Sequence, residues 1–266
     1  MLFDNKIVWV TGGGSGIGEA MAMEFAKQGA KVVVSGRRKE RLDSVVAAIG
    51  AERSLALPLD VTDEGAVHAA AQKIQSHFGA LDVAVANAGY GVAGRIEKLT
   101  AEDWRRQFDV NVVGLTTTVR AALPLLRERG GRVALLGSVM SQLTMPGNGA
   151  YASSKYAVRA IGQTLSMELA GSGVSCTTLH PGFVESEIGQ VDNGGVFDEQ
   201  RKDPRPQRFM WTSARAAKVC VQAISSRKRE FVFTGHGRVA AFIGRHFPGL
   251  NHLVGARGGS KKLPKG

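Results

Sequence analysis

Short apolar runs alternate with segments of helical periodicity along most of this chain, which limits the folds open to it. Residues 6–11 (KIVWVT) and 31–35 (KVVVS) are β-branched, apolar runs, typical of strands buried on both faces. Further strands are predicted at residues 54–57, 83–86, 132–136, 175–179 and 230–233. Helices are predicted between them at residues 16–28, 38–49, 64–78, 101–126, 151–169 and 213–224. This pattern predicts an α/β fold, a doubly wound, seven-stranded parallel sheet with helices on both faces.

A glycine-rich turn joins the first predicted strand to the first predicted helix. Its sequence, TGGGSGIG, places Gly12, Gly16 and Gly18 in a GxxxGxG spacing. Glycines at such a turn let the backbone approach a pyrophosphate, and the helix N-terminus meets the negative charge. A plain structural turn is the alternative, but the position of the turn after the first strand favours a dinucleotide site.

The end of the second predicted strand indicates which dinucleotide this site takes. Sites selective for NAD place an acid about 20 residues after the glycines, where it binds the ribose 2′-hydroxyl. Gly36 stands at this position, and Arg37 and Arg38 follow. Because a guanidinium binds a phosphate that a carboxylate would repel, the pair favours NADP, with Arg37 as the main contact. The alternative is that both are exposed charges at a helix start, where they would oppose the helix dipole.

Three residues form a candidate acid–base site. Tyr151 and Lys155 are four residues apart on a predicted helix, so their side chains share a face. An ammonium lowers the pKa of a neighbouring phenol, which is otherwise about 10. Ser138 follows the fifth predicted strand, at the edge where parallel sheets bind ligands. Ser141 is an alternative to Ser138, but Ser138 has the better spacing to Tyr151.

Together these motifs resemble the classical short-chain dehydrogenases/reductases, over roughly residues 3–235. The order and spacing of six elements carry the resemblance: TGGGSGIG, Asn87-Ala88-Gly89, Asn111, Ser138, YASSK from Tyr151 to Lys155, and Pro181-Gly182. The resemblance implies a Rossmann-type fold, with Tyr151 as the general acid/base that protonates a carbonyl oxygen as hydride arrives from the nicotinamide. It implies that Ser138 orients that oxygen and that Asn111 holds a water in the proton relay. Lys155 would bind the nicotinamide ribose and lower the pKa of Tyr151.

The resemblance also implies the cofactor contacts. Residues expected at the pyrophosphate and adenine are Gly12, Ser15, Gly16, Ile17, Gly18, Arg37, Arg38, Asp60 and Val61. Those expected at the sheet edge and the nicotinamide are Asn87, Ala88, Gly89, Tyr151, Lys155, Pro181, Gly182, Val184 and Ser186. Ser186 stands where a threonine is more usual and keeps the hydroxyl. His180 ends a strand in this family, so we expect a satisfied structural histidine there.

The net charge of +11 is concentrated near the C-terminus, since residues 227–266 hold nine Lys and Arg and one acid, Glu230. We predict one domain over residues 1–235, with residues 186–211 as its substrate-binding loop, and a basic amphipathic extension over residues 236–266. Val239, Phe242, Ile243 and Phe247 have the spacing of one helical face. This face is expected to pack over the substrate cleft or a neighbouring subunit. Contact with an anionic membrane surface is the alternative.

Other classes of protein are excluded by composition. No apolar run approaches the roughly 18–20 residues of a membrane span, and a strand beginning near Ile7 leaves no room for a signal peptide. Cys176 and Cys220 lack the spacing of a disulfide framework or a thiolate zinc site. We therefore expect a cytoplasmic protein without a metal.

These observations favour an NADP-dependent oxidoreductase, with NAD as the other possible cofactor, acting on a carbonyl or secondary alcohol of an apolar small molecule. The expected pocket residues are Val92, Val139, Met140, Leu143, Met145 and Phe183, with Phe197, Phe209, Met210 and Trp211 in the loop. A narrower alternative is a 3-oxoacyl (carrier protein or CoA) reductase, against which the long C-terminus argues. A third possibility is a dinucleotide-sensing protein that binds nucleic acid or membrane. Nucleic acid is disfavoured because the basic residues are not interleaved with aromatics. The resemblance implies a homodimer or homotetramer.

Overall fold

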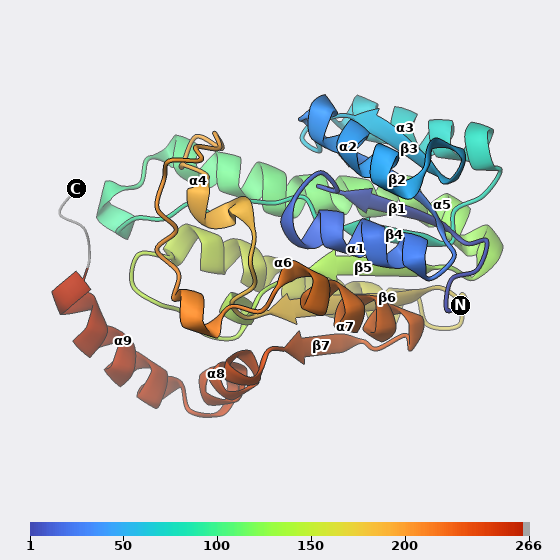
Figure 1. The fold of residues 1–266 in the computed structure, drawn as a ribbon. Coiled ribbons are helices and arrows are strands. Elements are labelled where there is room, and N and C mark those ends of the chain that lie inside the picture. Colours follow the sequence, from blue (N-terminus) through green and yellow to red (C-terminus); the bar gives the residue numbers. More distant parts are fainter. Residues whose placement is uncertain (263–266) are drawn as a thin grey trace.

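A computed structural model describes residues 1–262 and, for residues 258–262, the backbone alone. Its centre is a seven-stranded parallel sheet, as predicted, and the strands lie in the order β3-β2-β1-β4-β5-β6-β7 (Figure 1). The strands are β1 (Ile7–Thr11), β2 (Lys31–Gly36), β3 (Ser54–Pro58), β4 (Val83–Ala86), β5 (Arg132–Leu136), β6 (Ser175–Pro181) and β7 (Glu230–Phe233). The winding direction reverses between β1 and β4. Ligands of such sheets bind where the strand order reverses, at the carboxyl ends of the strands.

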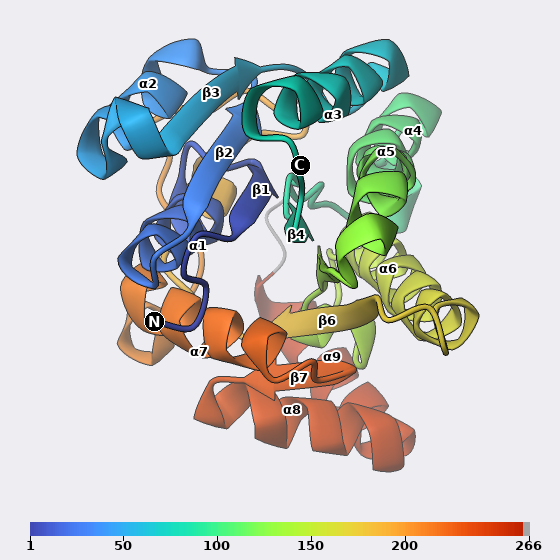
Figure 2. The ribbon, with the colours of Figure 1, turned by 90° about the vertical axis from the view of Figure 1, so that its right-hand side faces the viewer.

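Helices cover both faces of the sheet (Figure 2). One face carries α1 (Gly16–Lys27), α2 (Lys39–Ile49) and α7 (Ser213–Ser225), and the other carries α3 (Glu64–Phe78), α5 (Leu115–Arg129) and α6 (Gly149–Glu168). Alternate residues of a strand enter the two cores: Val8 and Val10 of β1 pack with the first set, and Ile7 and Trp9 with the second. Both faces are buried, which is why the strands are continuous apolar runs in the sequence.

The predicted helix over residues 101–126 is wrong as a single α-helix. It is divided into α4 (Ala101–Phe108), the π-helical segment η3 (Asp109–Gly114) and α5. A Cβ at Gly114 would lie 2.7 Å from Cγ2 of Val61, so the chain passes very close to the end of β3 at this point. The wider turn buries Asn111, and such insertions are frequent at functional sites.

The remaining elements are short 3-10 turns in the connections and two C-terminal helices. The turns are η1 (Ala51–Arg53), η2 (Ile96–Lys98), η4 (Val139–Ser141), η5 (Glu187–Gln190) and η6 (Gln207–Phe209). Helix α8 (Gly235–His246) contacts β7 and η4, and Pro248 begins a separate helix, α9 (Pro248–Lys262). Residues 263–266 of the predicted extension lie outside the described residues.

The predicted apolar face does not pack as a whole over the substrate cleft of the same chain. Val239, Phe242 and Phe247 are exposed, Ile243 is half-buried, and α8 buries Gly237 and Ala241. The physical reason is the close approach of α8 to the body of the protein, since a Cβ at Gly244 would lie well under 3.0 Å from the carbonyl oxygen of Gln142. Packing against a neighbouring subunit stays a prediction.

Candidate active site

The glycine-rich turn between β1 and α1 forms a backbone cradle that Asn87 closes. Gly12 and Gly16 have φ angles of 65° and 54°, in the left-handed region that favours glycine. A Cβ at Gly18 would lie well under 3.0 Å from the carbonyl oxygen of Gly12 and from Nδ2 of Asn87. Asn87 Nδ2 donates to the carbonyl oxygens of Thr11 (2.9 Å) and Gly12 (3.2 Å). The end of β4 is thereby tied to the turn.

No side chain caps the N-terminus of α1. Ser15 stands at the N-cap, but its side chain accepts from no backbone N–H of the helix. Ile17 points into the core. Uncapped N–H groups at a helix start and a close glycine backbone suit a pyrophosphate. The residues of this turn therefore fit the phosphate part of a dinucleotide.

The predicted adenine and sheet-edge residues lie beside this turn. Asp60 follows β3, and its Oδ1 accepts from the backbone N–H and the hydroxyl of Thr62 (3.0 and 2.9 Å). Val61 is buried. The backbone N–H of Ala88 donates to Oγ1 of Thr11 (3.3 Å), and a Cβ at Gly89 would lie 2.9 Å from Oδ1 of Asn111. These residues occupy the carboxyl ends of β3 and β4.

Ser138, Tyr151 and Lys155 meet at the carboxyl end of β5. Ser138 precedes η4, and its Oγ accepts from the backbone N–H of Met140 (3.1 Å). Tyr151 and Lys155 lie in the first two turns of α6. Lys155 is 4% exposed; its Nζ donates to the carbonyl oxygen of Leu136 (2.8 Å) and lies 5.7 Å from the centre of the Tyr151 ring.

The surroundings of these groups perturb their titration. Burial raises the pKa of Tyr151, while a hydrogen bond with Ser138 and the positive charge of Arg205 act in the opposite direction. Burial lowers the pKa of Lys155 to about 8. Tyr151 is therefore a phenol at neutral pH, with its proton available, and Lys155 keeps its charge up to mildly alkaline pH.

Asn111 connects the active-site loops. Its Oδ1 accepts from the backbone N–H of Tyr90 (3.1 Å), and its Nδ2 donates to the carbonyl oxygen of Tyr90 (3.0 Å) and to Oγ of Ser154 (3.1 Å). Both N–H donors of the amide are used in these bonds. The side chain holds the loop after β4 against α6, and its role in a proton relay stays a prediction.

His180 supports the turn that carries Ser138. It is fully buried, and its Nδ1 lies 2.9 Å from Oγ of Ser141 and 3.2 Å from the carbonyl oxygen of Ser138. Burial lowers the pKa of His180 to about 4, so the ring is neutral. Ser141 donates to the carbonyl oxygen of Ser138 (2.6 Å) and is fully buried, so it faces the interior. We expected both ring nitrogens of His180 to be hydrogen-bonded, but only Nδ1 is: Nε2 has no hydrogen-bond partner among the described residues.

The loop after β6 crosses the cofactor site. Glu187 forms ion pairs with Arg38 and Arg41 of the β2–α2 region, and hydrogen bonds with Ser15 as well as Arg38 lower its pKa against the opposing effect of burial. Arg37 donates to the carbonyl oxygen of Gly195 (2.9 Å). Both arginines that the sequence predicts at a 2′-phosphate are thus held by this loop. These contacts are not part of the alternative interpretation, in which Arg37 and Arg38 are only exposed charges at a helix start.

Further along, the loop reaches the opposite wall of the site. Asn193 exchanges two hydrogen bonds with the backbone of Ala93, each of 3.0 Å. Residues 187–198 therefore bridge the β2–α2 turn and the loop after β4.

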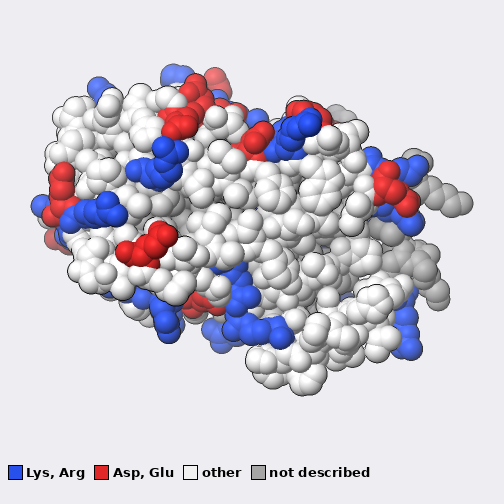
Figure 3. All heavy atoms as spheres, turned by 180° about the vertical axis from the view of Figure 1, so that it is seen from behind, with Lys and Arg blue, Asp and Glu red and all other residues white. Residues whose placement is uncertain are grey.

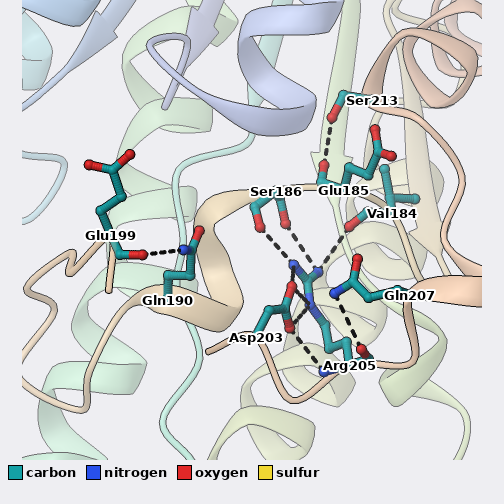
Figure 4. A network of polar contacts seen from close by, with 9 residues as sticks. All are labelled: Val184, Glu185, Ser186, Gln190, Glu199, Asp203, Arg205, Gln207 and Ser213. Carbon is teal, nitrogen blue, oxygen red and sulfur yellow. Dashed lines mark hydrogen bonds and ion pairs between the residues drawn. The ribbon is translucent and has the colours of Figure 1, made fainter. Parts of the chain in front are cut away.

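Arg205 fastens the other half of the loop beside the predicted nicotinamide residues (Figure 4). Its guanidinium donates to the carbonyl oxygen of Val184 (2.9 Å), to the hydroxyl of Ser186 (3.2 Å) and to the carbonyl oxygen of Ser186 (2.6 Å). Asp203 binds the same guanidinium through both carboxylate oxygens. A group of donors and acceptors thus lies next to Val184 and Ser186, where the resemblance places the nicotinamide. Preceding them, Pro181 ends β6, and Gly182 approaches Thr234 and His236 too closely for a side chain.

The aromatic residues of the loop, named above among the expected pocket residues, pack in different places. Phe197 lies over the guanidinium of Arg38, 5.4 Å from ring centre to carbon. Trp211 packs against Phe233, and the backbone of Trp211 pairs with Val184. Backbone bridges and cation–π contacts along the loop decide these positions, and its composition does not reveal them.

The sequence pattern did not single out Glu187 and Arg205 as supports of the site. For Glu187, the available signal was its position next to Ser186, a predicted cofactor contact. Arg205 lies in DPRP, which has the composition of an exposed turn. No local pattern indicates that its guanidinium folds back onto Val184.

The chain is similar to known oxidoreductases. A profile of the short chain dehydrogenase family matches residues 6–194. An uncharacterised oxidoreductase of Staphylococcus aureus strain MW2 is 36% identical over 202 residues, which cover 76% of this chain and 87% of that protein.

Solved structures show the same similarity in three dimensions. A short chain dehydrogenase/reductase from Burkholderia phymatum in complex with NAD matches with a TM-score of 0.82 and 27% identity, over 91% of this chain and 94% of that one. An alcohol dehydrogenase from the archaeon Thermococcus sibiricus, complexed with 5-hydroxy-NADP, matches with a TM-score of 0.75 and 28% identity, over 86% and 96%. The two structures carry NAD in one case and a derivative of NADP in the other.

Proposed function

This chain belongs to the short-chain dehydrogenase/reductase family and is an NAD(P)-dependent oxidoreductase; from this premise we propose that it transfers a hydride between NADP and a carbonyl or secondary alcohol carbon of an apolar small molecule. The observation that carries the proposal is the meeting of Ser138 and Tyr151 at the carboxyl end of β5, with Lys155 buried behind them. Gly12, Gly16 and Gly18 would hold the pyrophosphate of the cofactor, and Val184 and Ser186 would lie along its nicotinamide.

The proton chemistry follows from the environment of Tyr151. The bound cofactor supplies the hydride. Ser138 and Tyr151 both offer hydroxyl hydrogens to a carbonyl oxygen of the substrate, and this polarises the carbonyl bond. Tyr151 then gives its proton to that oxygen, and the resulting phenolate is stabilised by Ser138 and by the charge of Arg205. Burial raises the pKa of Tyr151, so the phenol holds at neutral pH the proton that carbonyl reduction requires.

The preference for NADP rests on the charges at the end of β2. Gly36 leaves no carboxylate where one would bind a ribose 2′-hydroxyl, and Arg37 and Arg38 follow it. A 2′-phosphate would exchange with the loop partners of these guanidinium groups, which are the Gly195 carbonyl and the Glu187 carboxylate. A phosphate carries more charge than either partner and binds a guanidinium through two hydrogen bonds.

The test is NADPH oxidation with a panel of apolar ketones and aldehydes. Tyr151→Phe should lower kcat by about 10²–10⁴-fold while NADPH still binds, because only the transferable proton is lost. Tyr156→Phe is the matched control, since Tyr156 lies on the same helix and is 42% exposed. Full turnover by Tyr151→Phe would contradict the mechanism.

The same panel separates the alternatives. Turnover of acetoacetyl thioesters with none of the ketones would identify a 3-oxoacyl reductase. Tight NADPH binding without turnover of any carbonyl would leave the dinucleotide-sensing function.

A further inference from the structure

Helix α8 buries small residues, half-buries Ile243 and leaves Val239 and Phe242 exposed. Gly237 and Ala241 are buried, and a Cβ at Gly244 would lie well under 3.0 Å from the carbonyl oxygen of Gln142. Phe242 lies on the other side and is 57% exposed. A helix whose only role was to cover its own domain would bury its large apolar side chains. The way α8 packs therefore leaves Val239 and Phe242 exposed to solvent.

Helix α9 extends this exposed apolar surface. We define the C-terminal apolar face as six exposed side chains on α8, on α9 and at their junction: Val239, Phe242, Phe247, Leu250, Leu253 and Val254. The two helices contact one another; α8 lies beside β7, and α9 continues from it past the carboxyl ends of the strands (Figure 1). Single exposed apolar residues are ordinary, but a group of this size on adjoining helices marks a contact surface.

Basic residues predominate in the segment of the sequence that carries the C-terminal apolar face. Residues 231–266 contain six Lys and Arg and no Asp or Glu. Arg238 is exposed on α8, and Arg245 pairs with Glu230 of β7 at 3.2 Å. In Figure 3 the surface over α8 and α9, at the lower right, is uncharged at its centre and has Lys or Arg at its borders.

We propose that the C-terminal apolar face lies on the surface of an anionic lipid bilayer. Apolar side chains that enter the headgroup region, flanked by cations that meet anionic lipids, are the two elements of interfacial binding. Within residues 1–262 no helix is long and apolar enough to cross a bilayer, so the contact is one of lying on the surface.

Two other partners fit the same surface less well. A symmetric contact with a second copy would bring the basic segments together, and Glu230, the one acid in residues 227–266, is already paired with Arg159 and Arg245 of its own chain. A nucleic acid would use the cations but not the exposed Leu and Val side chains, which cannot stack on bases. Only an anionic and apolar partner uses both features of the surface.

The helices that carry the C-terminal apolar face contact the segment that follows Ser138, on the substrate side of the active site. Asn251 of α9 donates to the carbonyl oxygen of Thr144 (3.2 Å), and α8 contacts η4, which follows Ser138. Docking would thus bring the segment between Ser138 and Tyr151 next to the lipid. Under the proposed function, the substrates would then be apolar carbonyl compounds that partition into membranes.

The experiment is flotation of the purified full-length protein with vesicles. One set is phosphatidylcholine alone, and the other contains about one third phosphatidylglycerol. We expect binding to the anionic vesicles that is at least about tenfold stronger than to the neutral ones and weakens as salt shortens the Debye length. The double variant Phe242→Asp/Leu253→Asp should lose about tenfold or more in this binding. Met167→Asp, which makes one such change at a residue 69% exposed near the far end of α6, should bind as the unmodified protein does.

Several results would overturn the proposal. These are no preference for anionic vesicles, unchanged binding by the double variant, or an equal loss in Met167→Asp. A dimer in sedimentation velocity that the double variant alone dissociates, without vesicle binding, would assign the face to a second copy. Binding to duplex DNA but not to vesicles would assign it to nucleic acid. Melting temperature and NADPH binding of each variant show that the fold is intact, and neither readout depends on turnover, so the proposed function is tested separately.

Discussion

Replacing Glu187 by glutamine should increase the preference for NADPH over NADH. The Glu187 carboxylate forms ion pairs with Arg38 and Arg41, and Arg38 is one of the two residues predicted at the 2′-phosphate. NADPH must therefore replace a carboxylate already bound to the guanidinium. Glutamine has a similar shape but no charge, so Glu187→Gln frees the arginines and leaves the loop sequence otherwise unchanged.

The size of the effect follows from the exposure of the pairs. The Arg38 and Arg41 side chains are 41% and 51% exposed, so each pair contributes only a fraction of a buried ion pair. Exposed pairs contribute roughly 0.2–1 kcal/mol each, and two of them about 1 kcal/mol. This corresponds to an about fivefold lower Kd for NADPH. NADH has no 2′-phosphate to take the place of the carboxylate, so its Kd should change much less.

Fluorescence titration with NADPH and NADH measures both constants. The ratio of the two Kd values removes any effect of the variant on loop closure that both cofactors share. Glu185→Gln is the control, because Glu185 is an exposed residue two positions before Glu187 and the change removes the same charge. The difference should shrink at high salt. An unchanged or reversed ratio in Glu187→Gln would refute the reasoning that Arg38 meets the 2′-phosphate.

Three further outcomes are expected. The hydrogen bond with Ser138 lowers the pKa of Tyr151, so Ser138→Ala should move the acid limb of the pH–rate profile for alcohol oxidation to higher pH. An unchanged acid limb would contradict an effect of Ser138 on the titration of Tyr151. Because burial lowers the pKa of Lys155 to about 8, its positive charge is lost as pH rises through that value. The kcat/KM for NADPH should fall over the same range, and Lys155→Met should show no such fall. Gly18→Ala should cost about 2 kcal/mol of unfolding free energy in thermal or urea melts, because its Cβ has no space. Gly249→Ala, which meets nothing within 4 Å, should be near neutral, and equal losses in the two would contradict the steric argument.

The seven strands, their parallel sheet and the place of the glycine-rich turn were predictable from the chain itself, whereas the order of the strands in the sheet comes from the structure. The apolar runs around Val8 and Val33 are continuous because both faces of the sheet are covered, and this leaves a mark in the sequence. Tyr151 and Lys155 are also local, since four residues of α-helix place them on one face. The carboxyl ends of parallel strands then meet at one edge, which brings Ser138 into the same region.

The contacts of the loop over residues 186–211 were decided by the tertiary structure alone. Arg205 binds Val184 and Ser186, and Glu187 binds Arg38, across distances along the chain that no periodicity records. The direction of α8 is a second case. The spacing of Phe242 and its neighbours predicts an apolar face, but the approach of Gly244 to Gln142 determines that this face points outward. Periodicity specifies which residues share a side of a helix, and only packing against the rest of the molecule specifies which side is buried.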